Sequence, residues 1–493
     1  MMNISLINQA EKYLNKTAIL DQEKEFTYQD LLFVSHQVAS LLLTDKKDLQ
    51  EARIAYLIPS QFIHVATQWG IWRSGGIAVP LCISHPLPEL EYVIQDAQVS
   101  VIIAHPDYEI IARSLCDNNN CRLILTTEIN HSHNLTDLPD IDHHRRALIL
   151  YTSGTTGKPK GVVITHKNIL SQVQSLVKAW SWQECDRILH TLPLHHIHGI
   201  INVLTCALYS GAQCHLLPKF DAETVWDYII EGNLSIYMAV PTIYVKLINH
   251  WEQCDNTRKE KMTAGCKAMR LMVSGSAALP VKVLQAWQQI SGHFLLERYG
   301  MTEIGMALSN PLEGKRLAGY VGKPLPGVEV RLVDEEGNIV GDNTSGEIQI
   351  KGNNVFLEYW QKPEATQEAF IDGWFRTGDL AIVENDNYRI LGRLSVDIIK
   401  TGGYKVSALE IEEVLRTHPD IKDCAVVGVK DEQWGEKVCV AIIPTNKSDF
   451  TLDELRQWAK KRLAVYKIPT QMLIMNDFPR NAMGKVMKPK IWG

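Results

Sequence analysis

The chain reads Tyr-Thr-Ser-Gly-Thr-Thr-Gly-Lys-Pro-Lys-Gly-Val from residue 151 to residue 162, and the residues on either side decide the local fold. An apolar run, Ala147–Leu150, enters this stretch and a β-branched run, Val162–Thr165, leaves it, so the sequence predicts a loop that joins two strands. Glycines at positive φ let consecutive backbone amides turn toward one anion, and hydroxyls and lysines add donors and charge. The sequence therefore predicts a polyphosphate-binding loop made of Thr152, Ser153, Gly154, Thr155, Thr156, Gly157, Lys158 and Lys160.

Two other interpretations of this loop are less favourable. A Walker A loop has the pattern G-x-x-x-x-G-K-[ST], whereas here two residues separate Gly154 from Gly157 and Pro159 follows Lys158. A flexible turn rich in glycine and threonine needs no lysine, yet two lysines and four hydroxyl residues lie within the nine residues from 152 to 160.

Length and composition set the broad class of the protein. A chain of 493 residues is too long for one hydrophobic core, so at least two domains are expected. Hydrophobic residues make up 45% and charged residues 22% of the chain, which is typical of a soluble globular protein. The formal net charge of -6 provides no basic field, so we expect no nucleic-acid partner.

The sequence predicts a cytoplasmic location. No apolar run approaches the length of a membrane span, so no membrane segment is expected. The segment Met1–Leu20 has neither the apolar core of a secretory signal nor the Arg-rich character of an organelle transit peptide. The ten cysteines form no CxxC pair and are expected to be small buried hydrophobes in a reducing compartment.

Strand-like runs alternate with helix-like segments early in the chain, which predicts an α/β protein with mostly parallel sheets. The runs are Ile54–Leu57, Phe62–Trp72 (helix-like), Ile77–Leu81, Val101–Ala104 and Arg122–Thr126. After Gly319, glycines and prolines separate short β-branched runs such as Val328–Val333 and Glu347–Ile350, which predicts a β-rich subdomain.

The last part of the chain has a pattern of its own. The sequences Ser-Ala-Leu-Glu (407–410) and Thr-Leu-Asp-Glu (451–454) are capping boxes that begin two helices. Strand candidates Ala425–Val429 and Val438–Ile443 lie between them. We therefore expect a large N-terminal domain, residues 1–393, and a small, mobile α+β domain, residues 394–493, which at about a hundred residues is a plausible folding unit.

Five further motifs, together with the phosphate loop, resemble those of the acyl-adenylate-forming enzymes, which include the acyl-CoA synthetases, the adenylation domains of peptide synthetases and the luciferases. They are Arg-Tyr-Gly-Met-Thr-Glu (298–303), Phe-Arg-Thr-Gly-Asp (375–379), Gly-Arg (392–393), Gly-Gly-Tyr-Lys-Val-Ser (402–407) and Pro-Arg-Asn-Ala-Met-Gly-Lys (479–485). They stand in the family's order and span about two thirds of the chain. The resemblance implies an enzyme that uses ATP and Mg²⁺ to form an acyl-AMP and then passes the acyl group to CoA.

The resemblance also implies where the nucleotide binds. Asp379 would accept the ribose hydroxyls, although on its own an aspartate after glycine is more often a turn residue. Glu303 would bind Mg²⁺, since this ion is commonly held by one or two carboxylates and phosphate oxygens. The remaining implied nucleotide ligands are Gly275, Ser276 and Ala277 beneath the adenine, Tyr299 stacked on it, Gly300 and Met301 of the same motif, Thr302 at a phosphate, and Arg393 at the ribose or phosphate.

Lys485 is the residue expected to catalyse adenylation. Its ammonium could neutralise charge at the α-phosphate and the substrate carboxylate as the new bond forms. The alternative is a solvated lysine like Lys488 and Lys490, but the Pro-Arg-Asn-Ala sequence before it favours catalysis.

The resemblance implies that the small domain rotates once pyrophosphate has left. Rotation would withdraw Lys485 and bring Gly402 and Gly403 beside the path of the CoA pantetheine arm. The family usually has a charged hinge residue two positions after the arginine of Gly-Arg, whereas here the chain continues Leu-Ser-Val-Asp, so the hinge candidates are Ser395–Asp397.

Three histidines, His195, His196 and His198, raise the possibility of a metal site. No acid or cysteine stands nearby in the sequence to complete one. The segment resembles the one that lines the family's acyl pocket, so pocket lining is favoured, for His196 above all, with an ordinary core or surface histidine as the alternative.

Arg298 points to the acid that is activated. Many family members have a small or apolar residue there, and the block from 296 to 310 resembles the malonyl-CoA synthetases, as do residues 240–246 and 273–280. A cation is costly beside a fatty tail but suits a second carboxylate, so Arg298, and with it Lys246, are candidate substrate ligands. Lys246 departs from some malonate-activating relatives, which carry arginine. The alternatives are that Arg298 pairs with Glu297 and that Lys246 lies on a solvated helix face.

The sequence thus predicts an ATP-dependent acid–thiol ligase that forms malonyl-CoA or methylmalonyl-CoA. The alternatives are a CoA ligase for a short or aromatic monocarboxylate, an adenylation enzyme that loads a carrier protein, and a nucleotide-binding regulator without turnover. The oligomeric state is not encoded in any pattern that we recognise.

Overall fold

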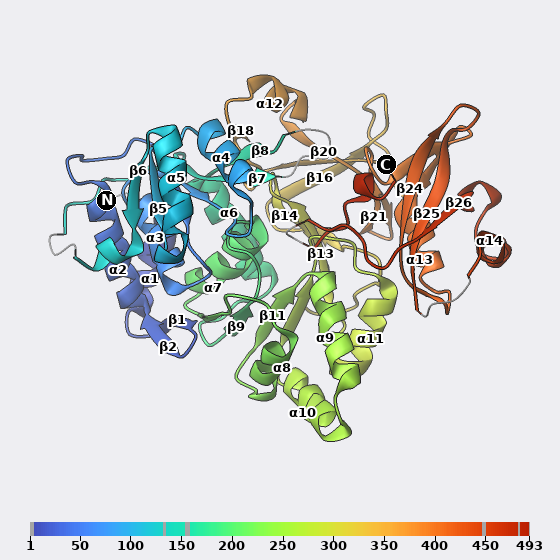
Figure 1. Ribbon diagram of the computed structural model, residues 1–493, viewed down its shortest axis with the longest axis horizontal. Helices are drawn as coiled ribbons and strands as arrows, with labels where there is room; N and C mark the ends of the chain where they lie inside the picture. The colour runs from blue at the N-terminus through green and yellow to red at the C-terminus, as the bar shows by residue number, and fades with distance from the viewer. Residues whose placement is uncertain (1–3, 132–134, 153–157, 446–449, 482–483, 493) are drawn as a thin grey trace.

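The computed structural model describes residues 4–131, 135–152, 158–445, 450–481 and 484–492. Figure 1 shows a large part, which extends to β21 (Asn387–Arg393), and a small part, orange to red at the right, which contains the C-terminus. The large part holds three sheets and the small part a fourth. The predicted α/β class, with a β-rich subdomain and a small α+β domain, is confirmed.

The first sheet contains the early strands expected from the sequence. Its strands, in pairing order, are β18 (Glu358–Tyr359), β8 (Lys160–Thr165), β7 (Arg146–Thr152), β4 (Ile77–Pro80), β3 (Arg53–Leu57), β5 (Val101–Ala104) and β6 (Arg122–Leu125). The helices beside it are α2 (Tyr28–Leu42), α3 (Phe62–Arg73), α4 (Leu87–Asp96) and α5 (Glu109–Asn119).

This sheet is parallel from β7 to β6 and antiparallel at β8 and β18, and its parallel part is covered on both faces. Ala55 and Leu57 of β3 belong to an apolar cluster with residues of α4 and α5. Ile54 and Tyr56 belong to a second cluster with residues of α2 and α3. Strands with two buried faces read as continuous apolar runs, as β3, β4 and β5 do.

The second sheet brings the middle of the chain together. In pairing order its strands are β15 (Lys323–Pro324), β14 (Gly305–Ser309), β13 (Leu296–Met301), β12 (Leu271–Ser274), β11 (Ile236–Ala239), β9 (Arg187–His190), β10 (Gln213–Leu216), β1 (Thr17–Asp21) and β2 (Lys24–Thr27). The helices of this part of the chain are α1 (Ser5–Ala10), α6 (His166–Ala179), α7 (Cys206–Tyr209), α8 (Ala222–Ile230), α9 (Pro241–Gln253), α10 (Asn256–Lys267) and α11 (Val281–Ser291).

The run β9, β11, β12, β13 is parallel, so the carboxyl ends of these strands lie at one edge. In open α/β sheets ligands bind outside this edge. The segments that leave it carry His196, Gly275 and the 298–303 motif, which explains how residues a hundred positions apart enter one site.

The β-rich subdomain is antiparallel. Its strands are β16 (Val328–Val333), β17 (Gly346–Gly352), β19 (Phe370–Ile371), β20 (Trp374–Glu384) and β21, with α12 (Pro363–Ala369) beside them. The predicted strand at 328–333 has the same bounds as β16, and the run 347–350 lies inside β17.

The small part packs two helices on a sheet. Its elements are β22 (Ile398–Thr401), β23 (Tyr404–Ser407), α13 (Ala408–Leu415), β24 (Ile421–Asp431), β25 (Gly435–Pro444), α14 (Leu452–Ala459) and β26 (Gln471–Ile474). The capping box predicted at Thr451 is complete: the Thr451 hydroxyl accepts the Glu454 amide, and the Glu454 carboxylate accepts the Thr451 amide. At Ser407 only half of the box forms: its hydroxyl caps α13, while the carboxylate of Glu410 pairs with Lys467 at 2.6 Å instead.

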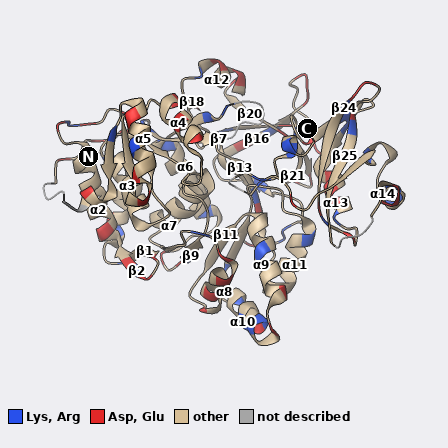
Figure 2. Ribbon diagram, in the orientation of Figure 1, with Lys and Arg blue, Asp and Glu red and all other residues tan. Residues whose placement is uncertain are grey.

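Figure 2 shows acidic and basic residues distributed over every part of the ribbon, as expected for a chain with a small net charge. In the part of the chain that the structure describes, every helix is too short or too polar to span a bilayer.

Candidate active site

The phosphate loop joins β7 to β8, which confirms the predicted pair of strands. Tyr151 and Thr152 pair with Gly161 and Lys160, so β7 and β8 are antiparallel neighbours. Five of the predicted phosphate ligands, Ser153, Gly154, Thr155, Thr156 and Gly157, lie outside the described residues. Of the two loop lysines, Lys160 places its ammonium 4.7 Å from the centre of the Tyr359 ring and Lys158 places its own 5.6 Å from that of Tyr92.

Tyr359 connects this loop to the predicted magnesium ligand. Its hydroxyl donates a hydrogen bond of 3.0 Å to a carboxylate oxygen of Glu303. The carboxylate is buried, and burial raises its pKa above the usual range, with Tyr359 and Arg393 opposing the shift. A buried carboxylate of this kind is suited to bind a cation, because the oxygen lone pairs that Tyr359 does not use are no longer hydrated. Thr302, the predicted phosphate contact, is buried directly beside it in the turn between β13 and β14.

Asp379, the predicted ribose ligand, forms a closed set of contacts with Tyr299 and Arg393. The Tyr299 hydroxyl donates to its Oδ2 at 2.6 Å, and the Arg393 Nε donates to its Oδ1 at 2.8 Å. The Asp379 charge raises the pKa of Arg393 against the effect of burial. Two sequence motifs whose residues lie 80 positions apart along the chain therefore meet here.

Two glycines of the site allow close approach of other groups. A Cβ on Gly300 would lie 2.0 Å from the carbonyl oxygen of Gly305, so the motif requires glycine there. A Cβ on Gly275 would lie 2.4 Å from the central carbon of the Arg298 guanidinium. The predicted adenine-binding segment 275–277 is thus also the segment against which the candidate substrate arginine lies. Gly275 is buried, Ser276 half-buried and Ala277 exposed.

Arg298 is a buried cation without an ion-pair partner in the part of the chain that the structure describes. Its side chain belongs to a residue with 3% of its surface exposed, and its Nε and Nη1 have no hydrogen-bond partner among the described residues. Its Nη2 lies 3.4 Å from the Ser276 hydroxyl, which is a weak contact. Burial lowers the pKa of Arg298 to about 9, against the attraction of Glu297.

The alternative pairing of Arg298 with Glu297 is not formed. Adjacent residues of a strand point to opposite faces, and these two follow one another in β13. The Glu297 carboxyl accepts the Leu279 amide at 3.3 Å instead, and burial raises its pKa to about 8.

Two neutral histidines, His196 and His198, lie within electrostatic reach of Arg298. The Nδ1 of His198 lies 3.1 Å from the Ser276 hydroxyl, and His190 contacts the Gly199 carbonyl at 3.0 Å. Burial lowers the pKa of His196 to about 3 and that of His198 well below its ordinary value, and in both the Arg298 charge acts in the same direction. These imidazoles therefore stay uncharged at neutral pH.

The metal interpretation of this cluster gains no support. Among the described residues, the group with ligand atoms close enough for one ion is Asp142, His143 and His144, on the surface. The ring of His195 lies 6.1 Å from that of His85, centre to centre.

The remaining predicted residues lie around this centre. Lys246 is exposed on α9, with its ammonium 5.6 Å from the centre of the Phe220 ring, and its role in substrate binding stays a prediction. Lys485 is exposed, and the glycine before it packs against Thr242 in the first turn of α9: a Cβ on Gly484 would lie 2.9 Å from the Thr242 hydroxyl. Gly402 and Gly403 form the turn between β22 and β23, both at positive φ.

Two contacts of the site could not be read from the sequence. Tyr359 lies outside every motif, yet it joins the loop lysine to Glu303. Ser276 was expected beneath the adenine, and its hydroxyl instead bridges His198 and Arg298. Both contacts link residues far apart in the chain, so no local spacing signals them.

Comparison with known proteins gives a consistent family. Residues 6–360 match the AMP-binding enzyme family and residues 410–485 match the AMP-binding enzyme C-terminal domain. The mitochondrial malonate–CoA ligase ACSF3 of Xenopus laevis is 44% identical over 527 residues, which covers 99% of this chain and 91% of that protein.

Solved structures agree with this match. The crystal structure of ATP-bound MatB from Rhodopseudomonas palustris has a TM-score of 0.92 at 32% identity, covering 99% of this chain and 98% of that one. The apo structure of the same protein has a TM-score of 0.82 at 31% identity, with the same coverage of both chains. The arrangement seen here is therefore closer to the ATP-bound structure.

The unpaired Arg298 yields a prediction for stability. Arg298→Met removes a buried charge and keeps most of the volume, so we expect the free energy of unfolding of the ligand-free protein to rise by about 1 to 4 kcal/mol at pH 7. Because the pKa of Arg298 is about 9 in the folded protein, below its ordinary value, the penalty is complete at pH 7 and shrinks as the pH rises past that value. Urea unfolding at pH 7 and pH 10 measures both effects.

A matched control is Arg270→Met. Arg270 donates to both carboxylate oxygens of the buried Asp186, at 2.7 and 2.5 Å, so its removal should lower the free energy of unfolding. A loss of stability in both variants would contradict the view that Arg298 is uncompensated.

Proposed function

We propose that this chain, which belongs to the AMP-binding enzyme family, forms malonyl-CoA from malonate, ATP and CoA through a malonyl-AMP intermediate, releasing AMP and pyrophosphate. The names of its relatives, malonate–CoA ligases, support the choice of acid. Methylmalonate differs by one methyl group and is a second substrate of the same class.

The observation that carries this proposal is the uncompensated charge of Arg298. A buried guanidinium without an ion-pair partner among the described residues, with two neutral imidazoles within electrostatic reach, attracts an anion. Malonate has one carboxylate for adenylation and a second that can pair with Arg298. A monocarboxylate with an apolar tail would leave the guanidinium buried and unpaired, which costs several kcal/mol. The pocket therefore favours a short dicarboxylate.

Adenylation follows from the surrounding residues. Asp379 binds the ribose hydroxyls once its carboxylate gives up the hydrogen bond from Tyr299 or from Arg393. Thr152 and Lys160 attract the phosphates. A malonate oxygen then attacks the α-phosphorus; the new P–O bond forms as the bond to pyrophosphate breaks. Lys485 stabilises the charge that accumulates on the oxygens in transfer. In the second half-reaction the CoA thiolate attacks the acyl carbon, and AMP leaves with the bonding electrons.

The proposed function includes Mg²⁺, with Glu303 as its candidate ligand. Its carboxylate is buried, has a raised pKa and accepts a single side-chain hydrogen bond, from Tyr359. An ion held there would neutralise the leaving pyrophosphate. Tyr359 orients the carboxylate, and Lys160 above the Tyr359 ring adds positive charge on the same side.

Two further points stay predictions. The acceptor is proposed to be CoA rather than a carrier protein, which the wording of the relatives' names supports. The cytoplasm is proposed as the location, although the named frog relative is mitochondrial; fractionation of cells that express the full gene would decide.

The proposal predicts a product pattern. With ATP, Mg²⁺ and CoA, malonate should release pyrophosphate and AMP, whereas acetate, butyrate and benzoate should release far less. A coupled pyrophosphate assay with chromatography of the nucleotides measures this. ADP as the main product would exclude adenylate chemistry, and a preference for butyrate or benzoate would support the monocarboxylate alternative.

Arg298→Met should change the choice of acid. The distal carboxylate of malonate loses its partner, which should reduce kcat/KM for malonate by about 2 to 5 kcal/mol of transition-state stabilisation. Butyrate carries no such charge and should be spared or improved. An equal loss for malonate and butyrate would mean that Arg298 only supports the Tyr299 strand.

Lys485→Ala should separate the two half-reactions. We expect malonate-dependent pyrophosphate release to fall by about 10²-fold or more, because the charge at the α-phosphate loses its stabilising cation. Thioester formation from supplied malonyl-AMP involves no pyrophosphate departure and should stay close to the wild-type rate. Equal damage to both half-reactions would refute a role confined to adenylation.

A further inference from the structure

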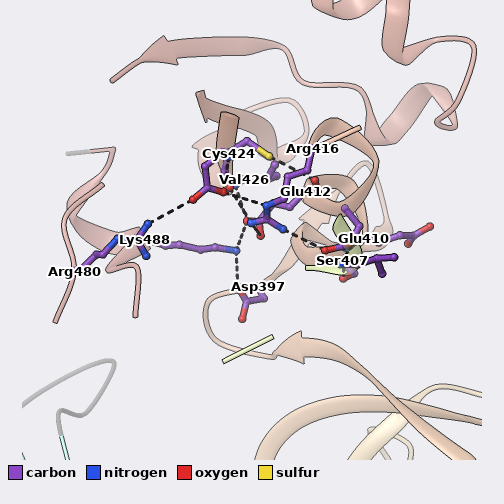
Figure 3. Close-up of polar contacts among 12 residues, drawn as sticks. Asp397, Ser407, Glu410, Glu412, Arg416, Cys424, Val426, Arg480 and Lys488 are labelled. Atoms are coloured by element: carbon purple, nitrogen blue, oxygen red, sulfur yellow. Dashed lines mark hydrogen bonds and ion pairs between the residues drawn. The ribbon is translucent and has the colours of Figure 1, made fainter. Parts of the chain in front are cut away.

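A second lysine lies three positions after Lys485 and is buried. Lys488 has 9% of its surface exposed, unlike the exposed Lys490 of the same turn, so the expectation that it is a solvated lysine is wrong. Its ammonium lies 2.6 Å from the Asp397 Oδ1 and 2.7 Å from the Glu412 Oε1. Figure 3 shows the side chain extended between these two acids, with Asp397 on one side and α13 on the other.

The two acids differ in how far they depend on Lys488. Glu412 has other partners, since it accepts the Val426 amide at 2.8 Å and pairs with Arg416 at 3.2 Å (Figure 3). Asp397 has Lys488 as its one ion-pair partner among the described residues, and its second oxygen accepts the Arg393 amide at 3.1 Å. Loss of Lys488 would therefore leave Asp397 as a buried carboxylate without a paired cation.

Asp397 is also within the electrostatic reach of Lys485. The pKa of Asp397 is lowered against the effect of burial, first by Lys488, and the positive charge of Lys485 contributes in the same direction. Lys485 itself has an exposed side chain whose ammonium has no ion-pair partner among the described residues. A flexible lysine beside an unpaired buried carboxylate would form an ion pair with it.

We propose that Lys488 is a positioning residue of the adenylation half-reaction, which neutralises Asp397 and so keeps the ammonium of Lys485 free for ATP. The inference rests on the proposed function, because it assumes that Lys485 acts on the α-phosphate. The same ion pair ties the Lys485 segment to the connection that follows Arg393, where the Asp397 amide donates to the Arg393 carbonyl at 2.8 Å.

The test compares two double variants of the full chain that differ only in the acid that remains. Lys488→Met with Asp397→Asn removes the acid that would hold Lys485, and the remaining Glu412 keeps its pairing with Arg416 and the Val426 amide, so adenylation should stay near that of the wild type. Lys488→Met with Glu412→Gln leaves Asp397, which should capture Lys485 and reduce malonate-dependent pyrophosphate release by about 10²-fold. Each double variant removes one positive and one negative charge, so neither leaves both acids uncompensated.

Three further measurements complete the design. Thioester formation from supplied malonyl-AMP, measured on the same preparations, should be similar in both double variants, because Lys485 is not needed there. Lys490→Met is the matched control and should behave as the wild type in both half-reactions. Lys488→Met alone, where it folds, should resemble the variant that retains Asp397.

The outcomes are distinct. Equal adenylation in the two double variants, or parallel losses in both half-reactions, would overturn the proposal and leave Lys488 a purely structural residue. A wild-type protein without malonate-dependent pyrophosphate release would instead refute the proposed substrate; the same comparison would then be made with the acid that is activated.

Discussion

The buried guanidinium of Arg298 is the constraint around which the acyl side of the site is arranged. It lies on β13, between β12 and β14, where packing removes water from it. Gly275 leaves room for the group, and the imidazoles beside it are kept neutral by burial and by the same charge. A cation among neutral groups has an excess charge that only an anion from outside can balance. The second carboxylate of the proposed substrate would balance this charge.

Other buried cations of the protein show that this incompleteness is local. Lys488 has two carboxylates, and Arg416 has Glu412 at 3.2 Å and Asp423 at 3.1 Å. Burial of paired charges with satisfied hydrogen bonds fixes a structure without inviting a ligand. The charge network of the small domain is closed, whereas no ion pair of the described residues balances Arg298. This contrast separates groups that stabilise the fold from a group that we propose binds the substrate.

Most of the fold was accessible from the sequence because its elements are locally determined. The run 328–333 became a strand with the same bounds, and Thr451 with Glu454 made its full capping box. Motif spacing also identified Asp379 and Glu303, whose surroundings support their implied roles. Contacts across the chain escaped prediction: Tyr359 reaches Glu303 over 56 residues, and Lys488 reaches Asp397 over 91. Lys488 and Lys490 cannot be told apart in the sequence, because only the folded sheet and helix of the small domain bury Lys488.

The contacts around Arg393 explain how one connection can serve both ends of the reaction. Arg393 holds the ribose ligand Asp379 with its side chain, while its backbone amide and carbonyl hold Asp397. Asp397 in turn pairs with Lys488, three residues from Lys485, the proposed catalytic lysine. The candidate hinge, residues 395–397, therefore ends at Asp397, whose charge is neutralised by Lys488 within the small domain. A rotation there would break the two contacts of Asp397 with the Arg393 backbone and keep the buried ion pair between Asp397 and Lys488. Its free-energy cost would be small, because water can replace the two hydrogen bonds and no buried charge loses its partner.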